Sequence, residues 1–154
     1  IYYNYFNTGR PGPKKEVFWS HYSDESNQPL YPFGYGLSYT KFDYTNLQID
    51  ESDPLKIRVS VSIKNTGKFS GEEVVQVYIH DKIASVVRPV KELKAFKKIF
   101  LKAGESKTVQ FDISPLALGF YDAAMNYVVE PGEFEIMTGC NSNDLQTISV
   151  KLIN

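Results

Sequence analysis

A strict alternation of apolar and polar residues between Leu55 and Lys64 constrains the fold more than any other feature of this sequence. In the run LKIRVSVSIK, every second residue is aliphatic and the residues between are serine, lysine or arginine. A period of two places the apolar side chains on a buried face of a β-strand and the polar ones on a wet face. The same period returns in EVVQVYIH (73–80), KTVQFDI (107–113), GEFEIMTG (132–139) and TISVKLI (147–153). These runs predict a series of half-buried strands.

Turn residues separate the predicted strands. Residues 65–67 (Asn-Thr-Gly) and 103–104 (Ala-Gly) carry turn chemistry, and 130–133 (Glu-Pro-Gly-Glu) fit a type II turn. One short helical turn is predicted over 114–118, where the serine would be the N-cap and the following proline the first helical residue. About seven short strands at this spacing predict an all-β, immunoglobulin-like β-sandwich. The Cys…Trp…Cys pattern of true immunoglobulin domains is absent, which favours a fibronectin type III-like variant.

The first 44 residues follow a different pattern from the rest of the chain. They hold more than half of the aromatic residues and half of the eight prolines, and no regular period appears before about residue 42. In the stretch PLYPFGYGLSYT (29–40), proline and glycine interrupt both helix and strand. Because disordered segments are poor in aromatic residues, we expect this segment to be extended and held by contacts. We therefore divide the chain into an arm, residues 1–41, and a sandwich, residues 42–154.

Length, charge and composition are those of an ordinary globular domain. The 154 residues carry a net charge of −1 at pH 7, which gives no field to attract nucleic acid or an anionic membrane. No apolar run approaches the roughly 20 residues that span a bilayer. Cys140 is the single cysteine, so no disulfide within the chain is predicted, and a half-buried thiol is favoured over a reactive one. The chain begins at Ile1 rather than methionine, and we expect it to be part of a longer protein.

No set of residues has the spacing of a catalytic, metal or cofactor site. Three groups of neighbouring carboxylates occur in predicted loops: Asp24 with Glu25, Asp50 with Glu51 and Asp53, and Glu72 with Glu73. We interpret them as solvated surface acids rather than as the catalytic pair of a glycosidase. The group around Asp50 could offer oxygens to Ca²⁺, but it lacks the glycine and distal glutamate of an EF-hand loop. His21 with Asp24 lacks a nucleophile, His80 is predicted to be a surface residue, and residues 34–36 lack the third glycine of a dinucleotide loop. We therefore predict no catalytic residue, no metal site and no cofactor.

The arm carries the strongest candidate functional residues, the aromatic side chains of Tyr31, Phe33, Tyr35 and Tyr39. Exposed aromatic surface implies a partner or a ligand, and sugars also stack on tyrosine faces. Tyrosine is suited to protein interfaces, while glycine allows close backbone approach and proline fixes the chain direction. This combination favours docking of the arm in a groove of another domain over an open sugar platform. In the basic run RPVKELKAFKK (88–98), a wet strand face or a contact with a neighbouring domain is favoured over nucleic acid.

Five strings of the sequence resemble, in order, parts of one known family. YYNYFNTGRP (2–11) resembles a strand-exit segment that ends in Gly-Arg-Pro, and PLYPFGYGLSYTKFDY (29–44) resembles a linker before a last domain. VSIKNTGKFSGEEVVQVYI (61–79), RPVKELKAFKKIFLKAGES (88–106) and EPGEFEIMTG (130–139) resemble successive parts of that fibronectin type III-like domain. The family is glycoside hydrolase family 3, of the bacterial periplasmic β-glucosidase type, and the resemblance is to its C-terminal end. It covers nearly the whole chain.

The resemblance implies a three-part parent enzyme, in which a fibronectin type III-like domain comes last. A (β/α)8-type barrel carries an Asp nucleophile in a Ser-Asp-Trp setting, and an α/β sandwich domain carries a Glu acid/base. Such enzymes retain the anomeric configuration through a covalent glycosyl intermediate. Neither catalytic motif lies in these 154 residues, and Ser23-Asp24 is followed by Glu25 rather than Trp. The resemblance also implies a parent that acts on β-glucosides or β-xylosides and is periplasmic or secreted.

Three functional hypotheses remain. The first is a non-catalytic accessory domain that stabilises and orients the catalytic domains of the same parent chain, with the four aromatic residues of the arm docked on them. The second is an autonomous carbohydrate-binding module, which would show two or three exposed rings in line on one sandwich face. The third is a protein–protein module that makes the parent a homodimer through a contact of more than about 1,000 Å². In the first and third, carbohydrate is a substrate of the parent only.

Overall fold

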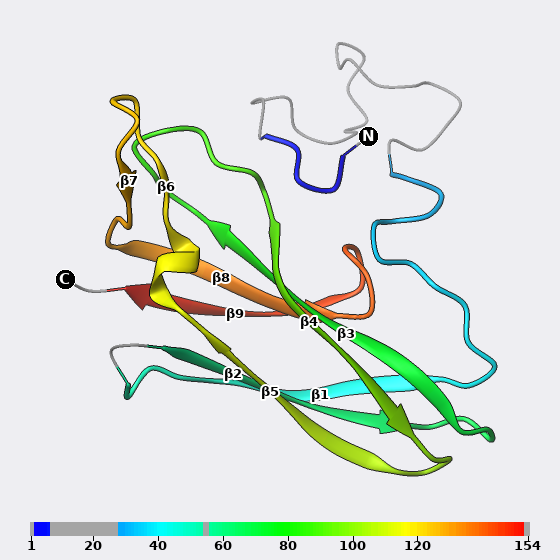
Figure 1. Cartoon of the computed structure of the whole chain (residues 1–154). Helices are drawn as coiled ribbons and strands as arrows, with labels where there is room; N and C mark the ends of the chain where they lie inside the picture. Colours follow the sequence, from blue (N-terminus) through cyan, green and yellow to red (C-terminus); the bar gives the residue numbers. More distant parts are fainter. Residues whose placement is uncertain (1, 7–27, 54–55, 153–154) are drawn as a thin grey trace, which may run out of the picture.

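The structure, a computed structural model, describes residues 2–6, 28–53 and 56–152. In these residues two antiparallel sheets pack face to face (Figure 1). The three-stranded sheet has the order β1 (Phe42–Asp50), β2 (Ile57–Asn65), β5 (Ser106–Ile113). The four-stranded sheet has the order β4 (Glu92–Leu101), β3 (Gly71–Asp81), β8 (Gly132–Gly139), β9 (Leu145–Leu152). The predicted all-β, fibronectin type III-like sandwich is confirmed.

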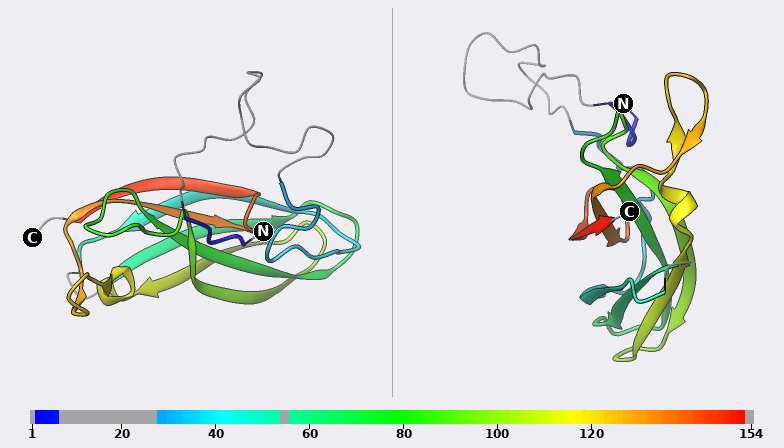
Figure 2. Two further views of the ribbon diagram at one scale, coloured as in Figure 1. Left: turned by 90° about the horizontal axis from the view of Figure 1, so that it is seen from above. Right: turned by 90° about the vertical axis from the view of Figure 1, so that its left-hand side faces the viewer.

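The core lies between the two sheets, which Figure 2 shows from two further directions. In β2 the alternation predicted from the sequence is fully realised, because Ile57, Val59, Val61 and Ile63 are all buried. The four-stranded sheet contributes the facing side chains of Val75, Val77, Ile79, Phe134 and Ile136. Each such side chain stabilises the fold by about 1.5–3 kcal/mol, so this interface is the main source of stability.

Strand β1 contains a bulge that keeps both of its halves packed on the core. Its register with β2 shifts between Thr45 and Gln48, next to Asn46, whose φ is 54°. An extra residue in a strand reverses which positions face inward. The core-facing residues therefore change from even to odd numbers along the strand: Phe42, Tyr44, Leu47 and Ile49.

A short irregular section connects β5 to β8. It contains the 3-10 helix η1 (Pro115–Leu118) and the small hairpin of β6 (Phe120–Tyr121) and β7 (Tyr127–Val128). The predicted helical turn is confirmed, with the Ser114 side chain accepting a hydrogen bond from the Leu116 N–H at 3.3 Å. No helix within the described ranges is long and apolar enough to cross a membrane.

Two of the predicted turns are confirmed, and one is wrong. Asn65 ends β2 and its side-chain oxygen accepts from the Gly67 N–H, and Gly104 has the positive φ of 78° that its turn requires. The type II turn over 130–133 would need a positive φ at Gly132. Gly132 is instead the first residue of β8 and pairs with Leu152 of β9, so the strand begins where the turn was expected.

Candidate interdomain docking site

The outer face of β3 departs from the predicted alternation in the middle of the strand. Val75, Val77 and Ile79 face the core as expected, which places Gln76 and Tyr78 on the opposite side of the sheet. Both are nevertheless buried, with relative exposures of 4 % and 0 %. The arm covers them, because its described parts, residues 2–6 and 28–41, contact this side of the sheet before the chain enters β1 (Figure 1).

Three aromatic rings from the arm and the sheet stack on one another. The Phe33 ring lies 4.2 Å from the Tyr3 ring, centroid to centroid, with an interplanar angle of 18°. Tyr3 in turn meets the Tyr78 ring edge to face at 5.8 Å. Such pairs add about 0.5–1.5 kcal/mol each beyond the burial of their area. The stack therefore joins two distant parts of the arm to the sandwich.

Gln76 connects the arm to the turn between β8 and β9. Its amide Nε2 donates to the carbonyl oxygens of Cys140, at 2.6 Å, and Gly34, at 3.3 Å, and its Oε1 accepts from the Tyr78 hydroxyl. Gly34 has a φ of 80°, and a Cβ at this position would lie 2.1 Å from Gln76 Oε1. The backbone N–H of Tyr35 bonds the Pro32 carbonyl at 3.0 Å, so Gly34 is the third residue of a turn. Both the turn and the close approach require glycine here.

The β8–β9 turn and the segment before β4 complete the seat of the arm. The Ser142 N–H donates to the Phe33 carbonyl at 2.8 Å, and the Ser142 carbonyl accepts from Lys91 Nζ at 2.6 Å. Burial lowers the pKa of Lys91. The Val90 N–H donates to the carbonyl of Tyr5 at 2.9 Å. Part of the basic run over 88–98 therefore supports the arm rather than forming a uniformly wet strand face.

The lower end of the arm is fixed by one buried amide. Asn65 is completely buried, and its Oδ1 accepts from the Thr40 hydroxyl at 2.6 Å and from the Gly67 N–H at 3.1 Å. Its Nδ2 donates to the carbonyls of Phe69, at 2.8 Å, and Leu101, at 3.1 Å. All four hydrogen-bonding positions of the side chain are thus filled. Asn65 ties the last residues of the arm to both sheets.

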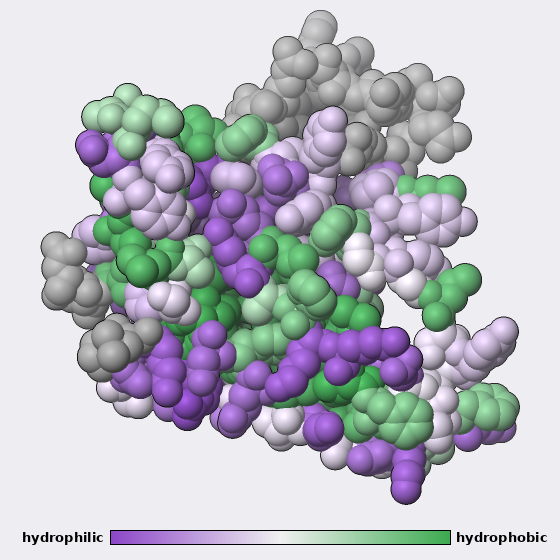
Figure 3. All heavy atoms as spheres, viewed as in Figure 1, coloured by the Kyte–Doolittle hydropathy of each residue, from purple (hydrophilic) through white to green (hydrophobic). Residues whose placement is uncertain are grey.

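The four aromatic residues predicted to dock on another domain differ in exposure. Phe33 packs against Tyr3 and is 45 % exposed, while Tyr31 and Tyr35 are 67 % and 46 % exposed and lie 5.3 Å apart as a tilted pair. Tyr39 is 97 % exposed. Leu30 and Leu37 of the same segment are also exposed, and side chains project outward along this flank (Figure 3). The arm therefore has an inner side seated on the sandwich and an outer side that presents apolar groups.

Sequence reasoning missed the residues that hold the arm in place: Tyr3, Asn65, Gln76, Lys91 and Ser142. Gln76 carried no signal, because an amide is ordinary on the wet face that the alternation predicts for this position. Tyr3 carried none, since it resembles every other tyrosine of the arm. Only the tertiary contacts distinguish them.

Of the carboxylates considered for catalysis, Asp50, Glu72 and Glu73 make structural contacts. Asp50 accepts from the Ser52 N–H at 2.9 Å, and the hydrogen bonding with Ser52 lowers the pKa of Asp50. Glu72 and Glu73 lie in β3 rather than in the predicted loop, because β3 continues to pair with β4 as far as Gly71. Glu72 forms an ion pair with Lys98 at 2.6 Å. Among the described residues no group of three or more His, Cys, Asp or Glu could hold a metal ion, so the Ca²⁺ alternative gains no support.

His80 and Cys140 likewise show no catalytic arrangement in the described part of the chain. His80 pairs with Glu135 at 3.1 Å between β3 and β8. Cys140 is half-buried, as expected, and burial raises the pKa of its thiol. His21, Asp24 and Glu25 lie outside the described residues.

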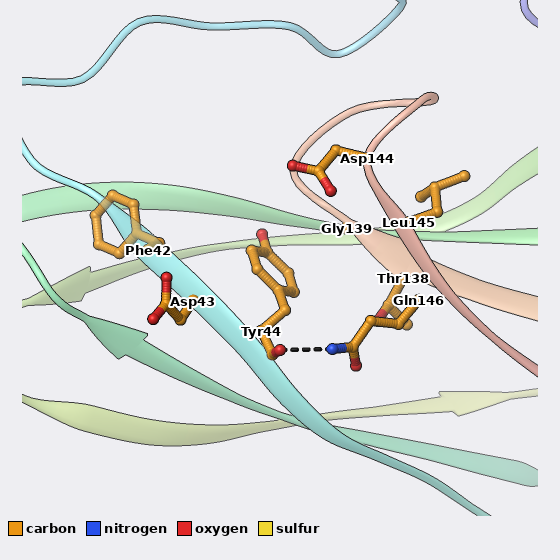
Figure 4. A pocket seen from close by; sticks show the side chains of 8 residues that line it. All are labelled: Phe42, Asp43, Tyr44, Thr138, Gly139, Asp144, Leu145 and Gln146. Carbon is orange, nitrogen blue, oxygen red and sulfur yellow. Dashed lines mark hydrogen bonds between the residues drawn. The ribbon is translucent and has the colours of Figure 1, made fainter.

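A second feature is a polar end of the sandwich interior. Tyr44 of β1 faces inward and its hydroxyl donates to Oε1 of Glu73, at 2.7 Å, on the core-facing side of β3. The amide of Gln146 on β9 donates to the Tyr44 carbonyl and so joins the edges of the two sheets (Figure 4). Beside these groups lies a pocket of about 250 Å³. Its walls are Phe42, Asp43, Tyr44, Thr138, Gly139, Asp144, Leu145 and Gln146.

The inward-facing Glu73 gives a prediction about pH. Burial raises the pKa of Glu73 above its usual 4.5, and the hydrogen bond from Tyr44 opposes this only in part. A raised carboxyl pKa in the folded state means that stability is lost as the pH rises through that value. We expect the stability of Glu73→Gln relative to the wild type to increase as the pH rises above 4.5. Urea unfolding at several pH values measures this.

Glu72→Gln is the matched control, because its side chain lies on the outer face and pairs with exposed Lys98. Its effect should stay within about 1 kcal/mol at every pH. A Glu73→Gln variant whose difference from the wild type does not change with pH would contradict the assignment.

Comparison with known proteins identifies the region to which the chain corresponds. Residues 73–142 match the family model of the fibronectin type III-like domain. The periplasmic β-glucosidase of Salmonella typhimurium is 46 % identical over 160 residues, covering 99 % of this chain and 21 % of that protein. The putative β-xylosidase of Formosa agariphila is 50 % identical over 127 residues, covering 80 % of this chain and 17 % of that protein.

The solved structures agree with the relatives. The β-glucosidase of Listeria innocua in complex with glucose superposes with a TM-score of 0.91 and 42 % identity, covering 100 % of this chain and 22 % of the enzyme. The chain thus spans about a fifth of the length of these proteins, in their C-terminal part. The chain therefore corresponds to the C-terminal, non-catalytic fibronectin type III-like region of the β-glucosidases of glycoside hydrolase family 3.

Proposed function

We propose that this domain stabilises and orients the catalytic domains of a parent enzyme that hydrolyses terminal β-glucosides, by docking the outer side of its arm on them. The observation that carries the proposal is the division of the arm into two sides. Phe33, Gly34 and Tyr3 make contacts within the chain, whereas Tyr31, Tyr39 and the neighbouring leucines remain mostly exposed. Exposed apolar surface of this kind marks an interaction site.

The energies are sufficient for such a role. Each tyrosine or leucine that becomes fully buried stabilises a contact by about 1.5–3 kcal/mol. Two or three of them would fix the orientation of a domain joined to its partner by the same chain, since no translational entropy is lost on docking. The contacts of the arm with the sandwich also fix how its outer side is oriented. The hydrogen bonds at Gln76, Ser142 and Asn65 hold both ends of residues 33–40 against the sandwich.

The experiment compares the same substitution in two contexts. Tyr39→Ser should change the free energy of unfolding of the 154-residue chain by less than about 0.5 kcal/mol, because the ring is almost fully exposed. In the full-length parent enzyme it should cost about 1.5–3 kcal/mol, since the ring would be buried there. Thermal unfolding measures the stability of each protein, and hydrolysis of an aryl β-glucoside measures the activity of the parent enzyme.

Tyr121→Ser is the control, because Tyr121 is an exposed tyrosine at the β6–β7 hairpin. Because its ring meets Tyr127 edge to face, Tyr121→Ser should have a small effect, and this effect should be the same in both contexts. Equal, small effects of Tyr39→Ser in the chain and in the parent would refute docking through this residue.

One observation favours the carbohydrate-binding alternative. Phe96 and Phe100 of β4 are exposed and stand on the same face of the strand, on either side of the ion pair between Lys98 and Glu72. Two rings in line on one sandwich face are the arrangement expected for a sugar platform. Titration with cellobiose or laminaribiose, followed by NMR, would shift the amides of β4 under this alternative and leave them unchanged under the first.

The compartment and the oligomeric state belong to the parent enzyme. We infer that the parent is periplasmic or secreted, which the periplasmic assignment of the Salmonella relative supports. Cell fractionation of the source organism tests this inference. A homodimer formed through this domain stays a prediction, and sedimentation velocity of the parent tests it. Whether the parent prefers glucosides or xylosides is set outside the residues described, and both kinds of enzyme occur among the relatives.

A further inference from the structure

The pocket between β1 and β9 presents hydrogen-bonding groups of both kinds. The carboxylates of Asp43 and Asp144 are acceptors on its rim, and the Thr138 hydroxyl is both a donor and an acceptor in its wall. Figure 4 shows Phe42 and Tyr44 on one side, facing the β8–β9 hairpin that carries the other groups. The pocket thus combines an aromatic wall with polar groups from two edge strands.

Thr138 points to a missing partner. It is completely buried on the core-facing side of β8, in step with Phe134 and Ile136, and its Oγ1 has no hydrogen-bond partner. A buried hydroxyl without a partner costs stability, and valine would fill the same space without that cost. Thr138 is among the residues that line the pocket, so a polar ligand bound there would supply the partner.

The chemistry of the walls selects among ligand classes. A metal ion is disfavoured, because no group of three or more His, Cys, Asp or Glu in the described residues could hold one. An anion would be repelled by Asp43 and Asp144, and an apolar molecule would leave the Thr138 hydroxyl unpaired. A ring with several hydroxyls fits, because it donates to the carboxylates and accepts from Thr138. Its C–H groups can lie against Phe42 and Tyr44.

We propose that this pocket binds a monosaccharide. A volume of about 250 Å³ is smaller than that of the usual pockets for drug-sized ligands, which suits a single sugar ring rather than a chain. The site is separate from the exposed rings of the arm and of β4. The inference rests on the proposed function only in the choice of glucose as the first probe.

The test is a titration of the ¹⁵N-labelled 154-residue chain with D-glucose, D-xylose and sorbitol. Glucose or xylose should produce saturable NMR shifts confined to amides 42–44 and 138–146. Sorbitol, which has the hydroxyls but no ring, should produce none. Thr138→Val should weaken binding by about tenfold while leaving the melting temperature unchanged or higher, since one good hydrogen bond corresponds to such a factor.

Thr147→Val is the matched control, because Thr147 lies on the same hairpin but is exposed on the opposite face. It should bind glucose as the wild type does. If Thr138→Val fails to fold, Asp144→Asn at the exposed rim replaces it, with weaker binding expected. No saturable shift with either sugar, equal shifts with sorbitol, or unchanged affinity of these variants would overturn the proposal. None of these results bears on docking of the arm, which Tyr39→Ser tests separately.

Discussion

Replacing Asn65 by aspartate should cost on the order of 3–5 kcal/mol of unfolding free energy at pH 7, because it leaves a buried carboxylate opposite two carbonyl oxygens. In the native protein the amide Nδ2 donates to the carbonyls of Phe69 and Leu101. Aspartate has the same shape but cannot donate there when ionised. The loss should shrink at acidic pH, as the introduced carboxyl gains a proton. Urea unfolding at pH 7 and pH 4 measures both values.

Asn143→Asp is the control for Asn65→Asp. Asn143 is exposed in the β8–β9 turn, so the same chemical change should cost less than about 0.5 kcal/mol. A loss below about 1 kcal/mol for Asn65→Asp would show that the two hydrogen bonds from Nδ2 to Phe69 and Leu101 contribute little to stability.

Gly34→Ala should cost on the order of 2–4 kcal/mol and release the arm from β3. An alanine at a φ of 80° is strained by about 1–2 kcal/mol. Its Cβ would also displace the Gln76 side chain, which then loses its bonds to Cys140 and Gly34 in a buried position. Hydrogen exchange of the Ser142 amide, which bonds the Phe33 carbonyl, should become faster.

Gly36→Ala, two residues away, is the control. No atom lies within 4 Å of a Cβ at position 36, and its φ is not positive, so alanine there should be neutral or slightly stabilising. If Gly34→Ala and Gly36→Ala gave the same stability and the same exchange rates, the seat of the arm would not depend on this glycine.

The strands were predictable because each follows from local rules. The alternation in β2 requires only that one face be buried, and Ser114 with Pro115 specifies a helical turn without any distant contact. The type II turn at Gly132 failed because the same Pro-Gly pair can precede a strand, and only pairing with β9 decided between them. Turn chemistry alone therefore left two outcomes open.

The candidate site was predictable only in part. Aromatic content singled out Tyr31, Phe33, Tyr35 and Tyr39, but it could not say which rings face the sandwich. That division depends on Tyr78, whose outward position in β3 looked solvated until the arm was seen to cover it. The alternation of apolar and polar residues in a strand shows which side chains share a face. It does not show which distant segment will cover that face, because tertiary packing decides this.

The covered face of β3 has a consequence for how this region can be exchanged between proteins. A cut at Phe42, where β1 begins, would separate the sandwich from the segment that seals Gln76 and Tyr78. A recombination event at that position would deliver a strand whose Tyr78 ring and Gln76 amide are no longer covered. A break upstream of Tyr3 would carry the seal along with the strands. The unit that can be exchanged without exposing this face is therefore longer than the sandwich alone, because it includes the segment of the arm that precedes β1.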